Sequence, residues 1–176
     1  MTFLENIFGL IDMRSFSSVW FWIVLALYWS SVSQFVLGAP YDLIIRARKG
    51  DNAQDMHDLQ TLVEVHGRRR LTMMRRAGHW IVAFAMALLT TIYMLAFHYG
   101  VEFAQAVFAL ILPLMIVRLM SLRLAFRIER EHLSEARLCR ALLTHRFWVQ
   151  ALGVVTIFVT AVWGMFQVMS RSTLGF

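Results

Sequence analysis

Two long uncharged segments limit the possible folds of this chain more than any other feature. They comprise residues 16–37 and 147–169, and neither contains Asp, Glu, Lys or Arg. A helix of about 20 apolar residues crosses the roughly 30 Å hydrocarbon core of a bilayer, so each segment is long enough to span a membrane. Of the 176 residues, 59% are hydrophobic and 16% are charged, whereas soluble domains carry about 25% charged residues. The sequence therefore predicts an integral membrane protein.

Two further apolar segments, residues 79–99 and 103–122, complete a set of four. The second of them is less regular because it contains Pro113 and Arg118. Arg118 lies near the end of the segment, so its guanidinium can reach the membrane surface while its stem stays in the lipid. We therefore predict an all-α fold, an integral membrane four-helix bundle in which residues 1–176 form a single domain.

The two long connections, residues 38–78 and 123–146, also have a helical pattern. In the first, Leu59, Leu62 and Val63 recur at helical spacing. In the second, acidic side chains can pair with arginines of either connection. We expect both connections to form amphipathic helical extensions of the bundle.

Basic residues are distributed unevenly along the chain. Fifteen of the 17 fall in residues 38–78 and 118–146, and the other two are Arg14 and Arg171. Connections that are rich in Arg and Lys stay in the cytoplasm. The two long connections are therefore predicted to be cytoplasmic, with both chain termini on the opposite side of the membrane.

The stretch HGRRRLTMMRRAGHW, residues 66–80, places five arginines directly before an apolar span. They are Arg68, Arg69, Arg70, Arg75 and Arg76. Within two or three turns of the membrane, each is expected to contact anionic lipid headgroups, which contribute about 1 kcal/mol per residue. Nucleic acid is not an expected partner, because these segments lack interleaved aromatic residues and a recognisable nucleic-acid-binding fold.

Two histidines, His79 and His145, lie at the inner ends of the second and fourth spans. Histidines that face each other from two helices can ligate a haem b axially. The simpler interpretation is that both lie at the membrane interface beside the tryptophans of an aromatic belt. We therefore predict no cofactor, and a haem b electron-transfer protein is the weakest of three functional hypotheses.

The residue types needed for metal binding or catalysis are sparse. Glu129 and His132 have the Glu-x-x-His spacing of di-iron bundles, but such sites need two of these motifs and two further Glu residues. The single cysteine, Cys139, allows no Cys-based metal site. Nothing resembles a nucleophile with its base or a phosphate-binding loop. We predict no metal, no catalytic residue and no enzymatic activity.

Small and weakly polar residues recur every four positions in the spans, for example Thr156, Thr160 and Gly164. Such stripes let membrane helices pack closely. Ion pathways usually need an ionisable residue near the middle of the bilayer, and the spans have none there. We therefore expect a non-enzymatic accessory or scaffold subunit that associates with other membrane proteins or with itself. The alternative is a homo-oligomeric channel or transporter whose path is lined by polar residues of the first or fourth span.

Three stretches carry a resemblance to a known family: LIDMRSFSSVWFW, VLGAPYDLIIRARKG and YGVEFAQAVFAL. They resemble a family of small, uncharacterised membrane proteins of alphaproteobacteria, some of which are described as a component of the SufBCD complex. The resemblance implies a bacterial inner (cytoplasmic) membrane protein, whose termini would then be periplasmic. It also implies a link to iron–sulfur cluster assembly, although one cysteine cannot itself hold a cluster.

Overall fold

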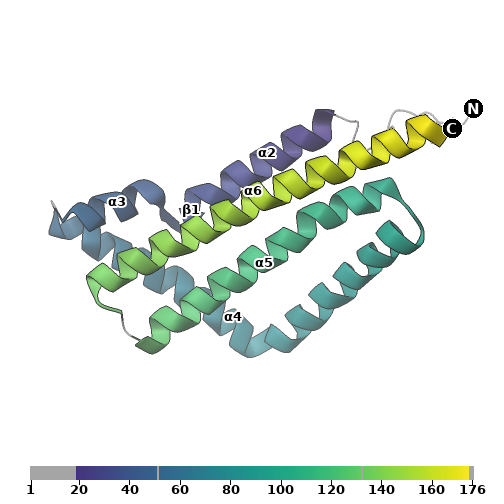
Figure 1. The fold of residues 1–176 in the computed structure, drawn as a ribbon. Helices are drawn as coiled ribbons and strands as arrows, with labels where there is room; N and C mark the ends of the chain where they lie inside the picture. The colour runs from purple at the N-terminus through teal and green to yellow at the C-terminus, as the bar shows by residue number, and fades with distance from the viewer. Residues whose placement is uncertain (1–18, 51, 132, 175–176) are drawn as a thin grey trace, which may run out of the picture.

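Helices make up nearly all of the structure. The computed structural model describes residues 19–50, 52–131 and 133–174. In chain order the elements are α2 (Val19–Gln34), β1 (Phe35–Val36), β2 (Ala39–Pro40), α3 (Tyr41–Lys49), α4 (Ala53–Tyr93), the π-helical turn η2 (Met94–His98), α5 (Glu102–Glu131) and α6 (Glu135–Leu174). The protein is an all-α helical bundle, which confirms the predicted fold class (Figure 1).

Within the described residues, three helices are long and apolar enough to cross a membrane. They are the continuous helix formed by α4 and η2, then α5, and then α6 as far as Gln167, and they contain 46, 30 and 33 residues. With the last turns of α6 included, these helices contain the predicted spans at residues 79–99, 103–122 and 147–169, apart from Tyr99, which follows η2. We take these spans as their membrane-crossing parts. The remaining turns of each helix extend beyond those parts. The chain is therefore a helical membrane protein.

The first predicted span, residues 16–37, is only partly helical. In the described part of the chain, α2 is apolar but has 16 residues, which is about 24 Å of helix. Residues 16–18 lie outside the described residues. At its other end the helix stops at Gln34, three residues before the predicted boundary.

A tight hairpin ends α2 and begins α3. Its register pairs Phe35 with Pro40 and Val36 with Ala39. The two loop residues, Leu37 and Gly38, have φ angles of +50° and +85°, the left-handed geometry that two-residue hairpin loops require. Leucine rarely adopts it, but Leu37 is 2% exposed, and burial of its side chain offsets the strain. Gly38 is needed because a Cβ there would lie 2.5 Å from the ring of His66.

The described part of the molecule has two hydrophobic cores, one in each half of its length. The core of the membrane half joins α2 to α5 and α6, and its buried members are Phe21, Leu25, Trp29, Ala106, Val117 and Val149. The other core joins the hairpin, α3, the first half of α4, the end of α5 and the start of α6. It includes Ile44, Leu59 and Leu142, each almost fully buried. The connections predicted as extensions therefore form a packed helical layer with its own core.

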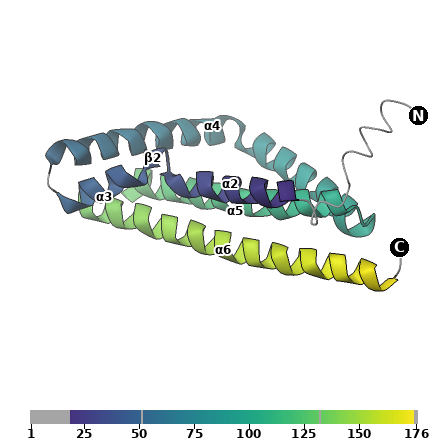
Figure 2. The same cartoon turned by 90° about the horizontal axis from the view of Figure 1, so that it is seen from above.

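The two long connections lie at the same end of the bundle. Both views show α3, the start of α4 and the α5–α6 connection there, whereas the start of α2, the link between η2 and α5 and the end of α6 lie at the opposite end (Figures 1 and 2). We call the first of these the arginine-rich end. This arrangement agrees with the hairpin pairing of helices that the charge distribution predicts.

A buried glutamine joins three helical segments at the end of the bundle opposite the arginine-rich end. Gln105 in α5 is 7% exposed, and its Nε2 donates to the carbonyl oxygen of Ala96 in η2 over 2.9 Å. Its Oε1 accepts hydrogen bonds from Trp163 Nε1 at 3.1 Å and from Gln167 Nε2 at 2.7 Å. One side chain thus joins the π-helical turn, α5 and α6.

Candidate functional site at the arginine-rich end

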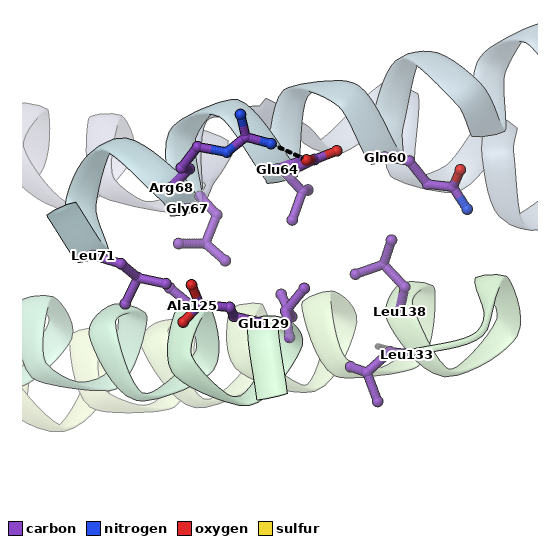
Figure 3. Close-up of a pocket in the computed structure, with 12 residues that line it drawn as sticks. Gln60, Glu64, Gly67, Arg68, Leu71, Ala125, Glu129, Leu133 and Leu138 are labelled. Carbon is purple, nitrogen blue, oxygen red and sulfur yellow. Dashed lines mark hydrogen bonds and ion pairs between the residues drawn. The ribbon is translucent and has the colours of Figure 1, made fainter. Parts of the chain in front are cut away.

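A pocket of about 490 Å³ lies between the first half of α4 and the end of α5 (Figure 3). Its apolar lining is formed by Leu37, Val63, Leu71, Ala125, Ile128, Leu133 and Leu138. Gln60, Glu64 and Arg68 lie along α4 on one side, and Glu129 lies across from them on α5 (Figure 3). The pocket therefore offers an apolar floor with a charged rim.

The pocket exists partly because α4 has a glycine at its centre. Gly67 lies between Val63 and Leu71 on the face that lines the pocket. A Cβ at Gly67 would meet no atom within 4 Å, so the space above it is open. A larger residue at this position would fill the pocket rather than collide with its walls.

The five clustered arginines do not form one surface. Arg68 pairs with Glu64 one turn earlier on α4, and Arg75 Nη2 lies 2.7 Å from Glu129 Oε2, which joins α4 to α5. Arg69 and Arg76 lie on an exposed face of α4 together with Arg68 and Met73. Among the described residues, no carboxylate pairs with Arg69, Arg70 or Arg76. Of the five, only Arg75 is therefore joined by an ion pair to another helix.

The electrostatic surroundings of Arg70 include a second arginine, which the sequence placed in a different segment. The positive charge of Arg118 in α5 acts on the guanidinium of Arg70 in α4. Arg70 is exposed overall, yet neighbouring atoms partly remove its guanidinium from water. This desolvation, and then the charge of Arg118, lower the pKa of Arg70.

The structure places the two candidate haem ligands in different surroundings. His79 is exposed on α4, where its ring packs beside that of Trp80. His145 is buried in α6, and its Nε2 lies 3.2 Å from Ser121 Oγ in α5. Burial and the charge of Arg70 lower the pKa of His145. In the described part of the chain, neither a hydrogen bond nor a ring contact joins the two histidines.

The candidate metal ligands are not gathered either. Within residues 19–50, 52–131 and 133–174, no three His, Cys, Asp or Glu side chains are grouped so that they could hold a metal ion. His132, the second residue of the Glu-x-x-His motif, lies outside these ranges. Glu129 instead pairs with Arg75.

Arg146 is a residue of this end that the sequence analysis did not single out. Its Cζ lies 3.3 Å from the centre of the Tyr41 ring, at the start of α3. Its Nε and Nη1 atoms are enclosed and have no hydrogen-bond partner in the described part of the chain. An adjoining cavity of about 20 Å³, lined in part by Ser33 and Ser121, is large enough for one water molecule and too small for an organic ligand. Arg146 lies directly before an apolar span, where a cation at the membrane interface is favoured. This position is the sequence feature that could have identified it.

A second, mainly apolar groove of about 370 Å³ runs between α5 and α6 in the membrane half. Phe97 of η2 lines it, together with Leu112, Pro113 and Val155 among others. Thr156 and Thr160, two members of the predicted small-residue stripe, are buried along it. The stripe therefore faces the α5–α6 interface.

No family model, curated protein or solved structure matches the chain.

Proposed function

We propose that the protein is a non-enzymatic accessory subunit of the bacterial inner membrane that binds other membrane proteins. The exposure of α4 inside the membrane carries this proposal. Only 6% of the most apolar window of this helix is buried within the molecule, against 28% in α5 and in α6. Between Gly78 and Ala96, every residue of the helix is exposed or only partly buried. This stretch presents an apolar surface that another membrane helix can cover.

The proposed arrangement in the membrane has four crossings, with α2 as the shortest. The arginine-rich end lies in the cytoplasm, because connections rich in arginine are retained there. Both termini are then periplasmic. Arg69 and Arg76, on the outward face of α4, contact anionic headgroups of the inner leaflet.

Site-specific photo-cross-linking in native membranes tests the proposal. A photoreactive residue is placed at Phe84 of α4, which is 72% exposed, or at Phe158 of α6, which is 67% exposed and serves as the control. We expect position 84 to form a protein adduct of discrete mass and position 158 to react with lipid. Lipid adducts alone at both positions would contradict the proposal.

The second candidate is a homo-oligomeric channel or transporter. It is favoured by the buried hydroxyls of Thr156 and Thr160 beside the groove between α5 and α6, since polar groups in spans can line a path. An adduct of twice the protein's own mass at position 84 would support self-association. Ion flux through liposomes that contain the purified oligomer would then replace the accessory-subunit proposal.

A further inference from the structure

The pocket between the first half of α4 and the end of α5 has the dimensions of a small-molecule site. Its volume of about 490 Å³ lies within the range of about 300–1,000 Å³ that is usual for ligand pockets. Such pockets combine apolar walls with a few polar groups that converge on the ligand. Here the walls are mainly aliphatic, and the polar groups come from two helices: Gln60, Glu64 and Arg68 of α4 and Glu129 of α5 (Figure 3). The pocket lies on a different part of α4 from the exposed stretch that carries the proposed function.

Gly67 is the residue of α4 that keeps the pocket open. Glycine inside a helix costs about 1 kcal/mol relative to alanine, so its presence there calls for a reason. Close packing gives none, since a Cβ at Gly67 would meet no atom within 4 Å. The backbone gives none either, because Gly67 lies within the α-helix and is not among the described glycines with a positive φ angle. Glycine is also used where a ligand approaches the backbone closely, and the open space above Gly67 agrees with that use.

The charged groups that line the pocket have an excess of negative charge. They are the carboxylates of Glu64 and Glu129 and the guanidinium of Arg68, whereas the whole chain has a net charge of +6. Each carboxylate uses one oxygen in an ion pair, Oε1 of Glu64 with Arg68 and Oε2 of Glu129 with Arg75, which does not line the pocket. In the described part of the chain, no hydrogen bond or ion pair occupies the second oxygen of either group. The rim therefore has one unused acceptor on α4 and another on α5.

We propose that the pocket between α4 and α5 binds a small amphipathic cation. The apolar body of the ligand packs against the aliphatic walls and the backbone of Gly67. Its ammonium group, which has several N–H donors and no acceptor, donates to the unused oxygens of Glu64 and Glu129. An anionic amphiphile would fit the same walls, but its carboxylate would face the two glutamates. The site depends neither on a protein partner nor on which side of the membrane this end of the bundle lies.

Isothermal titration calorimetry of the full chain in phosphatidylcholine nanodiscs tests the charge preference. Three probes share a naphthalene ring and differ in their polar group: naphthylethylammonium, naphthylethanol and naphthylacetate. The heat of partitioning into empty nanodiscs is subtracted. We expect one ammonium probe to bind per chain, about tenfold more tightly than the alcohol, because each of two partly exposed carboxylates contributes a factor of about three. Absence of saturable binding by the ammonium probe, equal affinity for the alcohol, or tighter binding of the acetate would overturn the proposal.

Two leucine variants locate the bound probe. Gly67→Leu fills the pocket, whereas Thr72→Leu adds a leucine to the exposed face of α4 that carries Arg69 and Met73. We expect Gly67→Leu to abolish saturable binding of naphthylethylammonium and Thr72→Leu to leave it unchanged, with the helix content of both variants checked by circular dichroism. Undiminished binding by Gly67→Leu would show that the probe occupies another surface, and the site would be refuted.

A carboxylate variant keeps the test decisive if Gly67→Leu does not fold. Glu64→Gln removes one charge from the rim together with the ion pair to Arg68. Glu131→Gln is the matched control, because it removes the same charge and an equivalent pair, to Arg127, away from the pocket. The affinity for naphthylethylammonium should fall about threefold in Glu64→Gln and stay unchanged in Glu131→Gln. An equal loss in both variants would assign the effect to net charge, and no loss in either would remove Glu64 from the site; both results contradict the proposal.

Discussion

Replacing Gln105 with leucine should destabilise the membrane half of the protein. Leucine has nearly the volume of glutamine, so the substitution removes the amide and little else. The hydrogen bonds that are lost join Gln105 to the Ala96 carbonyl at 2.9 Å, to Trp163 at 3.1 Å and to Gln167 at 2.7 Å. A hydrogen bond between membrane helices contributes about 0.6 kcal/mol on average. Loss of all three should therefore lower the free energy of unfolding by about 2 kcal/mol.

The local geometry explains why these bonds have no ready substitute. In the π-helical turn, Tyr99 donates to the carbonyl of Met94, and Val101 donates to the carbonyl of Leu95. The carbonyl of Ala96 accepts from Gln105 instead. Ala96 is fully buried, so water cannot replace the lost donor. The packing of the end of α4 against α5 and α6 therefore depends on the side chain of Gln105.

Equilibrium unfolding in mixed detergent micelles, followed by circular dichroism, measures the effect. Gln150→Leu is the matched control, because Gln150 is an exposed glutamine on α6, and its replacement should change the unfolding free energy by less than about 0.5 kcal/mol. If Gln105→Leu unfolds at the same detergent composition as the control variant, the hydrogen-bonded junction is not what holds η2 in place.

Three further substitutions or treatments test the packing. Gly67→Ala should raise the free energy of unfolding by about 1 kcal/mol, since alanine favours the helix and a Cβ there meets no atom within 4 Å. A lower thermal stability of the variant would show that the pocket has no room for the added methyl group. Gly153→Ala should lower the free energy of unfolding by about 1 kcal/mol, because the added Cβ would lie 2.8 Å from the Trp29 ring and overpacking outweighs the helix preference. An unchanged melting temperature would mean that α2 does not approach α6 so closely. Cys139 is buried, and burial raises the pKa of its thiol. Maleimide should therefore label Cys139 slowly at pH 7 in the folded protein and rapidly after denaturation. Equal labelling rates would contradict the position of Cys139 in the core.

The membrane segments could be predicted because hydrophobicity and length are local properties of the sequence. The grouping of both connections at one end also follows from the distribution of arginine. The end of α2 could not be predicted in the same way. Apolar residues continue through Leu37, so hydrophobicity gives no sign that the chain turns into a hairpin after Gln34. Gly38 and Pro40 were the available signals, and the left-handed φ of Leu37 shows that tertiary packing decided the turn there.

The contacts of the candidate site depend on residues that are distant in the sequence. An amphipathic pattern shows that a helix has an apolar face but not which helix covers it, so the second core was predicted only as helical extensions. Arg70 and Arg118 each have a separate explanation in the sequence, as a headgroup contact and as a residue that reaches the interface. Only the fold brings Arg118 near enough for its charge to lower the pKa of Arg70. For the same reason Gln105 is recognisable in the sequence as a polar residue in a span, whereas its three partners are not.

The polar contacts of α4 explain why its middle remains uncovered. Lipid tails are as apolar as leucine side chains, so no hydrophobic force drives one membrane helix against another. Polar bonds hold α4 to α5 at two levels, at Arg75–Glu129 near the arginine-rich end and at Ala96–Gln105 near the other. Between these levels, no described residue of α4 is buried after Gly78 and before Ala96. A partner helix that packs there needs to displace only lipid, because the bonds that hold α4 in its own bundle lie outside the surface that it would cover.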